Sequence, residues 1–321
     1  MIEIRQFSAK DEEFVDIVRI YNMVSHDDST HIDVEKDSWS LLDKSRAWGR
    51  LLLYDNDYAI GFLRYLKGRG SNINKCFFNI FIDPDHAGKG YRKMLYDKML
   101  KKIDQLNCNG LYMGIYDHPN YDHSKEFLKK TGFINKFKTR EYSLELDSLD
   151  LSKYNDLLDK LDKQGIQFYD SQLELSNSPN HYKKLEELMW IIDQDIPMPE
   201  GLSPERDKFE EFLKHQKMFE DKYYGVEIVA VCNDRYIGAT DIEVSPKSDP
   251  YKGWTGGLGV IKDYRRQGIA TALKVKAYQK LKAKGIKNIR TDNEENNPMY
   301  LINVELGFKP EPYGLEFQKE I

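Results

Sequence analysis

Residues 264–273, YRRQGIATAL, stand between an apolar run that ends at Val260 and Ile261 and a stretch with helical periodicity. Two arginines and a glycine therefore lie where a strand passes into a helix. The unpaired backbone N–H groups and the positive dipole at a helix N-terminus attract anions. Because Gly268 permits close approach of the backbone, the sequence predicts a phosphate-binding turn at residues 265–271.

The same rhythm recurs in HAGKGYRKML at residues 86–95. Three glycine anchors repeat at nearly constant offsets of 177, 178 and 175 residues. They are Gly61 and Gly238 in AIGF and YIGA, Gly90 and Gly268 in the two turns, and Gly132 and Gly307 in KKTGF and VELGF. Self-similarity at a fixed offset indicates a duplicated domain.

The order of predicted elements repeats as well. Each half begins with a strand and two helices, followed by a hairpin with an Asn-Asp turn, another strand, the glycine turn with its helix, a strand, a short helix and closing strands. We expect GLEFQKEI at residues 314–321 to close the second half. The length of 321 residues suits two domains, which we predict at 1–148 and 149–321 with a connecting helix at 150–163.

The composition favours a globular cytoplasmic protein. Hydrophobic residues make up 40% of the chain and the formal net charge is -5, which argues against general binding of nucleic acid. Cys76, Cys108 and Cys232 lack metal or disulfide spacing and are expected to be reduced thiols. The sequence shows neither a secretory h-region nor an 18-residue apolar run, so no membrane association is expected.

The charges are distributed unevenly. Residues 251–290 carry eleven positive side chains against one negative, whereas residues 186–243 carry 15 acids against 6 bases. Two solvated helix faces would explain part of this pattern. The sharper interpretation is a cationic groove for a phosphorylated cofactor beside an acidic surface for a cationic substrate.

The pattern R-x-x-G-x-A, from Arg265 to Ala270, resembles the acyl-CoA signature of the GCN5-related N-acetyltransferase (GNAT) superfamily. The downstream stretch at residues 290–308, with N-x-P-M and Leu-Gly-Phe, resembles that family too. The resemblance covers both halves. It implies an α/β (α+β) protein of two tandem GNAT-like domains, each a mixed, mostly antiparallel twisted sheet flanked by helices, with a splayed strand pair for acyl-CoA.

The resemblance also implies how acetyl-CoA would bind as co-substrate in the second half, without a metal. Backbone groups of a bulged, glycine-rich strand would pair with the pantetheine arm, the basic turn would hold the pyrophosphate, and two asparagines would lie near the thioester. The implied cofactor-binding residues are Leu258, Val260, Arg265, Arg266, Gln267, Gly268, Ile269, Ala270, Thr271, Asn293 and Asn296.

The first copy departs from this pattern. Alignment of Gly90 with Gly268 puts Ala87 at the place of Arg265 and Arg92 at the place of Ala270. The leading cation is lost, and a long side chain stands where a small one is needed. We therefore expect the N-terminal domain to be degenerate and the C-terminal domain to be catalytic.

The implied reaction is transfer of an acetyl group to a primary amine by direct attack, which needs a proton acceptor. Asp241 and Glu243 alternate with apolar residues on a strand and share one face, so both are candidate bases. Asn303 stands where the family often has a tyrosine that donates a proton to the leaving thiolate. Tyr300, one helical turn earlier, is the candidate substitute, and Asp193 and Asp195 are candidate substrate contacts.

The acidic stretch favours a small cationic amine as acceptor, while protein N-termini and lysines remain open. A non-catalytic acyl-CoA-binding sensor or scaffold is the alternative, because the tyrosine is absent and the first copy has diverged. Transfer of aminoacyl groups from tRNA is disfavoured by the net acidic charge. The chain is expected to act as a monomer or homodimer.

Overall fold

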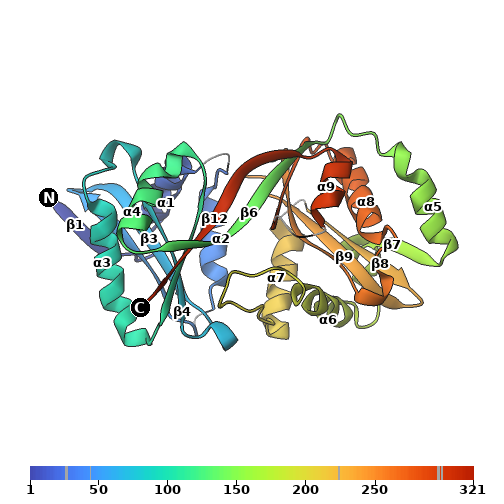
Figure 1. The fold of residues 1–321 in the computed structure, drawn as a ribbon, viewed down its shortest axis with the longest axis horizontal. Coiled ribbons are helices and arrows are strands. Elements are labelled where there is room, and N and C mark those ends of the chain that lie inside the picture. Colours follow the sequence, from blue (N-terminus) through green and yellow to red (C-terminus); the bar gives the residue numbers. More distant parts are fainter. Residues whose placement is uncertain (26–27, 44, 223–224, 295–296, 298) are drawn as a thin grey trace. The chain divides into compact units, whose positions relative to one another are not determined.

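The computed structural model describes residues 1–321 except 26–27, 44, 223–224, 295–296 and 298. The chain forms two compact units (Figure 1). The first unit comprises Met1–Thr139, Met198–Glu205 and Pro312–Ile321, and the second comprises Arg140–Pro197 and Arg206–Glu311. Because the segment 198–205 and the C-terminal strand return to the first unit, the units are not simple halves of the sequence. The boundary near residue 148, between the two copies of the duplicated domain, stays a prediction.

In the first unit, helices accompany strands in the order β1-β2-β3-β4-β5-β12 of the sheet. The elements along the chain are β1 (Ile2–Gln6), α1 (Asp11–Val24), α2 (Ile32–Leu41), β2 (Trp48–Asp55), β3 (Tyr58–Lys67), β4 (Lys75–Ile82), α3 (Tyr91–Ile103), β5 (Gly110–Tyr116), α4 (Asp122–Lys130) and most of β12 (Lys309–Glu320).

The second unit repeats this plan, with strand order β6-β11-β10-β9-β8-β7. Its elements are the end of β6 (Ile134–Glu145), α5 (Asn155–Lys163), β7 (Ile166–Asp170), α6 (His181–Asp193), α7 (Phe209–Lys222), β8 (Val226–Cys232), β9 (Arg235–Val244), β10 (Lys252–Val260), α8 (Ile269–Ala283), β11 (Asn288–Glu294) and α9 (Met299–Leu306).

Both predicted hairpins are confirmed. The turn residues Asn56, Asn233 and Asp234 have positive φ of 55°, 48° and 61°, as tight antiparallel turns require. Each hairpin also contains a β-bulge near the turn, between Leu53 and Tyr54 in one and between Ala230 and Val231 in the other. The extra residue changes which side chains stand opposite each other across the hairpin.

The expected closure of the second half by residues 314–321 is wrong. Residues Gly314–Glu320 of β12 pair antiparallel with Tyr116–Gly110 of β5, within the first unit. A strand edge offers unpaired N–H and C=O groups that any extended backbone can satisfy. The hydrophobic pattern of a closing strand therefore predicts a pairing but does not say which sheet receives it.

The predicted splayed strand pair is present in the second unit. Parallel pairing of β10 with β11 joins Lys252–Trp254 to Asn288–Arg290, after which β10 continues to Val260 and β11 to Glu294. On its other side β10 pairs with β9, and that register shifts between Thr255 and Leu258. This shift is the bulge expected for the run of glycines.

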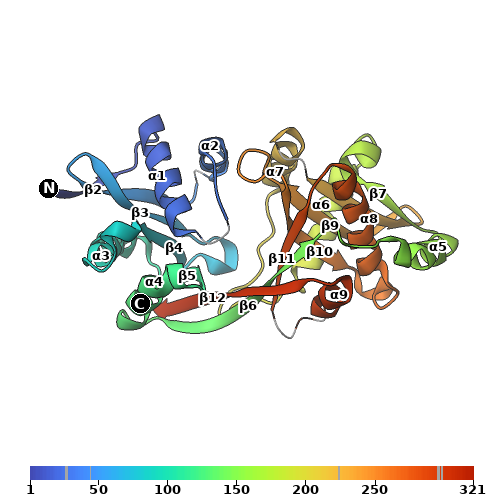
Figure 2. The ribbon, with the colours of Figure 1, turned by 90° about the horizontal axis from the view of Figure 1, so that it is seen from above.

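Helices α6 and α8 cover opposite faces of the strands in the second unit (Figure 2). A Cβ built on Gly238 would lie 3.2 Å from Leu273 of α8, whereas one on Gly259 would lie 2.2 Å from Ile192 of α6. Gly238 and Gly259 are on neighbouring strands and offset by one residue, so they point to opposite sides. None of the described helices combines the length and apolarity that crossing a bilayer requires.

Candidate active site

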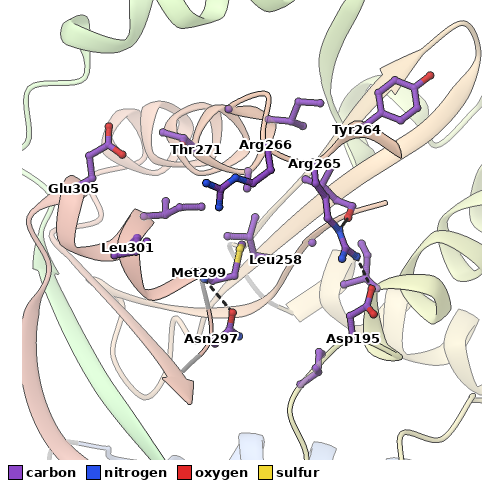
Figure 3. A pocket seen from close by; sticks show the side chains of 18 residues that line it. Asp195, Leu258, Tyr264, Arg265, Arg266, Thr271, Asn297, Met299, Leu301 and Glu305 are labelled. Carbon is purple, nitrogen blue, oxygen red and sulfur yellow. Dashed lines mark hydrogen bonds and ion pairs between the residues drawn. The ribbon is translucent and has the colours of Figure 1, made fainter. Parts of the chain in front are cut away.

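A cleft of about 550 Å³ opens in the second unit at the N-terminus of α8 (Figure 3). Its walls come from the C-terminal end of α6, the last residues of β10, the turn before α8 and helix α9. The lining residues are Ile192, Asp195, Ile196, Leu258, Gly259, Val260, Tyr264, Arg265, Arg266, Gly268, Ile269, Ala270, Thr271, Asn297, Met299, Leu301, Ile302 and Glu305.

The turn at the base of the cleft has an unusual backbone. Arg265 is extended, while Arg266 and Gly268 have positive φ of 63° and 87°. A non-glycine residue in this conformation costs about 1–3 kcal/mol and persists where the surroundings enforce it. Within the part of the chain that the structure describes, no side chain caps α8. The N–H groups of its first turn therefore lack intrahelical acceptors and point toward the cleft end of the helix.

The two arginines of the turn have different surroundings. Arg265 donates to the Val260 carbonyl at 2.7 Å and forms an ion pair with Asp195, which lies just after α6. Arg265 therefore ties the end of β10 to the end of α6. The side chain of Arg266 extends over the cleft between α8 and α9 (Figure 3), and no ion pair of Arg266 is found among the described residues.

Most of the residues implied for cofactor binding come together here. Eight line the cleft, namely Leu258, Val260, Arg265, Arg266, Gly268, Ile269, Ala270 and Thr271. Gln267 and Asn293 are not among the lining residues, and Asn296 lies outside the described residues. Ile269 is buried and packs in the core, so that its side chain anchors the turn and only its backbone can face a ligand.

The bulge of β10 is held by two side chains of β9. The Gly257 N–H donates to Asp241 Oδ1 at 2.7 Å, and Thr240 Oγ1 donates to the Gly257 carbonyl at 2.8 Å. A Cβ on Gly256 would lie 2.0 Å from Asp241 Oδ2. Glycine is therefore required where the bulge passes the Asp241 carboxylate, which meets the strand at the point where β10 has left β11.

A second carboxylate faces Asp241. Glu227 of β8 is its direct cross-strand partner, and its side chain is buried. Burial, reinforced by the Glu227 charge, raises the pKa of Asp241 to about 7. Burial also raises the pKa of Glu227. Two buried carboxyl groups on directly opposed residues cannot both ionise freely, so the pair holds a proton near neutral pH.

The other two candidate catalytic residues have less distinctive positions. Glu243 shares the strand face of Asp241 and is exposed, although desolvation raises its pKa. Tyr300 packs its ring 5.9 Å from that of Tyr142 and lies against the core. None of the three candidates is among the residues that line the cleft, although Asp241 contacts Gly257, which is next to the lining residue Leu258. Of these three candidates, Asp241 has the surroundings of a proton acceptor that works near pH 7.

Sequence reasoning missed two buried polar groups in the second unit, Glu227 and Lys274, neither of which lines the cleft. The bulge between Ala230 and Val231 shifts the hairpin register by one residue and brings Glu227 opposite Asp241. Lys274 looks like an ordinary helix cation in sequence, yet only 2% of its surface is exposed. Burial lowers its pKa to about 7. A lysine in the middle of an apolar helix face was the available signal.

The first unit repeats the turn but not its contents. Gly88 and Gly90 have positive φ of 77° and 84°, matching Arg266 and Gly268. Ala87 occupies the place of Arg265. Arg92, at the place of Ala270, is half-buried, its pKa is lowered by burial to about 10, and its buried Nε lacks a partner among the described residues.

The gap between β4 and β5 is bridged in the first unit. These strands also pair in parallel over only three residues, Lys75–Phe77. Beyond them Asn79 Nδ2 donates to the Gly114 carbonyl of β5 at 3.4 Å. The β3–β4 register runs without a shift, so β4 lacks the bulge that β10 has. An Asn side chain thus stands in the first unit where the second unit has glycines.

The Acetyltransferase (GNAT) family matches the chain over residues 12–133 and 185–304, more than half of its length. The chain belongs to this family. N-alpha-acetyltransferase 30 of Schizosaccharomyces pombe (strain 972 / ATCC 24843) is 32% identical over 136 residues, which are 40% of this chain and 81% of that protein. The predicted family is therefore confirmed, and with it acyl transfer from acetyl-CoA as the reaction of the family.

Solved structures confirm the tandem fold. A tandem GNAT protein from the clavulanic acid biosynthesis pathway superposes with a TM-score of 0.77 at 15% identity, covering 100% of this chain and 98% of that one. A GCN5-related N-acetyltransferase from Sphaerobacter thermophilus has a TM-score of 0.70 at 15% identity, covering 99% and 95%. At these identities the likeness concerns the fold alone.

The α8 end of the cleft has the features of a phosphate site. It offers uncapped helix N–H groups and the small Ala270 beside them. The described residues bring together no group of three or more His, Cys, Asp or Glu side chains that could hold a metal ion.

Proposed function

We propose that the second unit transfers the acetyl group of acetyl-CoA to the primary amine of a small cationic substrate by direct attack. One observation carries the proposal. Two features meet the same strand, β10. The uncapped turn with positive φ, which suits a phosphate, follows the end of β10. The Asp241 carboxyl, whose pKa is raised to about 7, contacts Gly257 of β10. When bound, acetyl-CoA supplies an acetyl group activated by attachment to sulfur.

The residues at the α8 end of the cleft would hold the donor. The N–H groups of residues 268–271 would bind its pyrophosphate, and Arg266 would add a charge that is not used in an ion pair among the described residues. Arg265 would act indirectly, because its side chain is engaged in an ion pair with Asp195 and would hold the wall of the cleft in place rather than contact the pyrophosphate. Backbone groups of Leu258 and Val260 would pair with the pantetheine arm.

Asp241 would accept the proton that the amine loses. A base with a pKa near 7 combines substantial ionisation at neutral pH with useful basicity. Glu227 would keep that pKa high through its charge across the strand pair. A backbone N–H at the bulge, near Leu258 or Gly259, would stabilise the negative charge that develops on the carbonyl oxygen.

The acidic face around the base would favour a cationic acceptor. Asp241, Glu227 and Glu243 all project from the α6 side of the sheet, and α6 and α7 belong to the stretch with 15 acids and 6 bases. A second positive group on the substrate would be attracted to Glu243, which is exposed beside the base. Small polyamines and aminoglycoside-like amines have this chemistry.

A peptide N-terminus is the second candidate acceptor. The relative from Schizosaccharomyces pombe is named an N-alpha-acetyltransferase, and an α-amino group has a lower pKa than an aliphatic amine. Such an acceptor would depend less on a strong base. A non-catalytic acyl-CoA-binding module remains the alternative from another class.

The test is release of free thiol from acetyl-CoA with a panel of diamines, aminoglycosides and peptides with free N-termini. We expect the cationic small amines to have the highest kcat/KM, and Asp241→Asn to lower it while Glu210→Gln, a surface control on α7, leaves it unchanged. Fastest turnover of peptides would favour the second candidate. Tight CoA binding without thiol release for any acceptor would instead identify a binding module.

We propose further that the first unit does not turn over acetyl-CoA. Arg92 at the place of Ala270 and the Asn79 bridge between β4 and β5 support this proposal. Both changes remove space that the second unit keeps with alanine and glycine. The first unit would then serve as a folded partner that receives the C-terminal strand of the chain.

A further inference from the structure

A lysine is buried where α8 packs on the core of the second unit. Lys274 is 2% exposed, and its Nζ donates to Oδ1 of Asn303 at 2.6 Å. Asn303, on α9, is itself 1% exposed. The ammonium also lies 5.0 Å from the ring centroid of Phe308. A buried charge is expensive unless it is paired with an opposite charge and hydrogen-bonded, and the hydrogen-bond partner of Lys274 is a neutral amide.

The hydrogen bonds continue from Asn303 to the edge of the splayed strands. Nδ2 of Asn303 donates to Oδ1 of Asn293 on β11. Asn293 lies three residues beyond Arg290, where the pairing of β10 with β11 ends, and its side chain is partly exposed. The chain of polar groups thus runs from the core to β11 beyond the point where β11 has separated from β10, at a residue that does not itself line the cleft.

The chemistry of the lysine fixes the direction of this chain. An ammonium group donates and cannot accept. Asn303 must therefore turn its oxygen toward Lys274 and its nitrogen toward Asn293. Asn293 in turn uses its oxygen to accept, which leaves its amide nitrogen as the outer donor of the chain.

The fold does not require this arrangement. Alignment of Gly90 with Gly268 puts Tyr96 at the place of Lys274, and alignment of Gly132 with Gly307 puts Leu128 at the place of Asn303. Both residues of the first unit are buried, and Tyr96 makes edge contacts with aromatic rings. The same structural positions are therefore filled without a buried charge in the unit that lacks the cleft residues.

The protonation of Lys274 depends on burial. Loss of hydration lowers its pKa to about 7 and is the cause of the change. Tyr278, one turn along α8, shares Phe308 as a neighbour, and its pKa is raised by burial, so it stays neutral. The charged residues on the same elements, none of which contributes to this lowering, are Lys276, Lys280, Lys282, Arg290, Asp292, Glu294 and Glu305.

We propose that Lys274 is a positioning residue that acts through Asn303 to orient the amide of Asn293 as a hydrogen-bond donor to the sulfur of the acyl donor. This inference rests on the proposed acetyl transfer. In the step, the amine nitrogen forms the C–N bond, the C–S bond breaks and its electron pair leaves on sulfur. Asp241 receives the proton of the amine, Asn293 donates to the thiolate, and Lys274 keeps its proton.

Deprotonation of Lys274 removes the direction of the chain. A neutral amine can accept a hydrogen bond, so Asn303 can turn its nitrogen toward Lys274 and present its oxygen to Asn293. Asn293 then turns as well, and its oxygen becomes the outer group. An oxygen repels the departing thiolate where an N–H stabilises it, so acetyl transfer slows as the pH rises through the pKa of the lysine.

The decisive variant is Lys274→Met, with Lys276→Met, a partly exposed lysine on the same helix, as the matched control. We expect Lys274→Met to lower kcat by about a hundredfold, the lower end of the range for groups that assist proton and charge movement. The KM for acetyl-CoA should stay within about twofold, since the variant does not touch the phosphate turn. The decline of kcat at alkaline pH should disappear from Lys274→Met and persist in Lys276→Met.

A measurement without turnover gives the second readout. Calorimetry in buffers of different ionisation enthalpy counts the protons exchanged when CoA or desulfo-CoA binds at pH 8. For the wild type we expect different proton counts for the two ligands. CoA has a thiol that the Asn293 amide can contact and desulfo-CoA has none, so only CoA should change the protonation of Lys274 through the hydrogen-bonded chain. For Lys274→Met we expect equal counts. Equal counts for the wild type would contradict the inference.

A double variant separates folding from positioning. Asn303→Leu alone should destabilise the second unit, because it leaves the Lys274 ammonium buried without its acceptor. Lys274→Met combined with Asn303→Leu restores an apolar interior like that of the first unit and should fold, with kcat as low as in Lys274→Met. A wild type that binds CoA but transfers no acetyl group would overturn the proposed function. A wild type that transfers while Lys274→Met keeps its kcat and alkaline decline would overturn only this inference.

Discussion

Replacement of Lys274 by methionine should change how the stability of the second unit depends on pH. The lysine is 2% exposed, and burial lowers its pKa from 10.5 to about 7. Between these two pH values the unfolded chain binds more protons than the native protein. The free energy of unfolding of the wild type therefore rises as the pH increases from 7 to 10.5. Methionine has nearly the same length and no proton to bind.

The size of the effect follows from the difference between the two pKa values. Each pKa unit corresponds to about 1.4 kcal/mol, so the lowering from 10.5 to about 7 penalises the native state by up to about 5 kcal/mol at pH 7 and below. Loss of the hydrogen bond to Asn303 costs Lys274→Met about 1–3 kcal/mol at every pH. The pH-dependent part is thus the reliable signature, and it fades by about 1.4 kcal/mol per pH unit above 7.

The assay is urea unfolding of the wild type, Lys274→Met and Lys276→Met at half-unit steps from pH 7 to pH 9.5, followed by circular dichroism. The advantage of Lys274→Met over the wild type should shrink steadily over this range. Lys276→Met should track the wild type, because its lysine is partly exposed. A difference between wild type and Lys274→Met that stays constant with pH would refute the claim that the native lysine has a lowered pKa.

Three further outcomes are expected. Asp241→Asn keeps an acceptor for the Gly257 N–H and should fold. Its kcat/KM should fall about a hundredfold and should no longer rise as the pH passes 7, where the wild-type carboxyl ionises. An unchanged pH profile would rule out Asp241 as the base. Gly259→Ala places a Cβ 2.2 Å from Ile192 and should destabilise the second unit by about 1–3 kcal/mol while weakening CoA binding, so a variant with wild-type stability and affinity would contradict the close packing. Arg92→Ala should leave turnover within about twofold, because Arg92 lies in the first unit, which is proposed not to turn over acetyl-CoA. A large loss of activity in a folded variant would show that the first unit takes part.

Much of the fold could be predicted because its signals are local. Asn56 and Asn233, which have positive φ, lie in turns that the Asn-Asp pairs predict. The run of glycines likewise predicts the bulge of β10. The position of residues 314–321 was predicted wrongly, because β12 pairs with β5 in the other half of the sequence. Which sheet edge accepts a strand is decided by tertiary packing, which a hydrophobic pattern does not record.

The candidate site divides in the same way. The phosphate turn depends on consecutive residues, so the prediction placed eight lining residues from sequence. Glu227 faces Asp241 only because a bulge shifts the hairpin by one residue, and single-residue shifts are invisible to an alternating pattern. Arg265 was expected to meet a phosphate, yet in the structure it pairs with Asp195. Sequence showed which charges exist and not which of them neutralise each other.

We propose that the chain binds the acyl donor at one cleft, at the N-terminus of α8 in the second unit. Titration calorimetry of the full chain with CoA tests it most directly, using the wild type and Ala270→Arg, which gives the second unit the residue that the first unit has at Arg92. We predict one CoA per chain for the wild type and none for Ala270→Arg. Two CoA per chain, or one that persists unchanged in Ala270→Arg, would contradict the account.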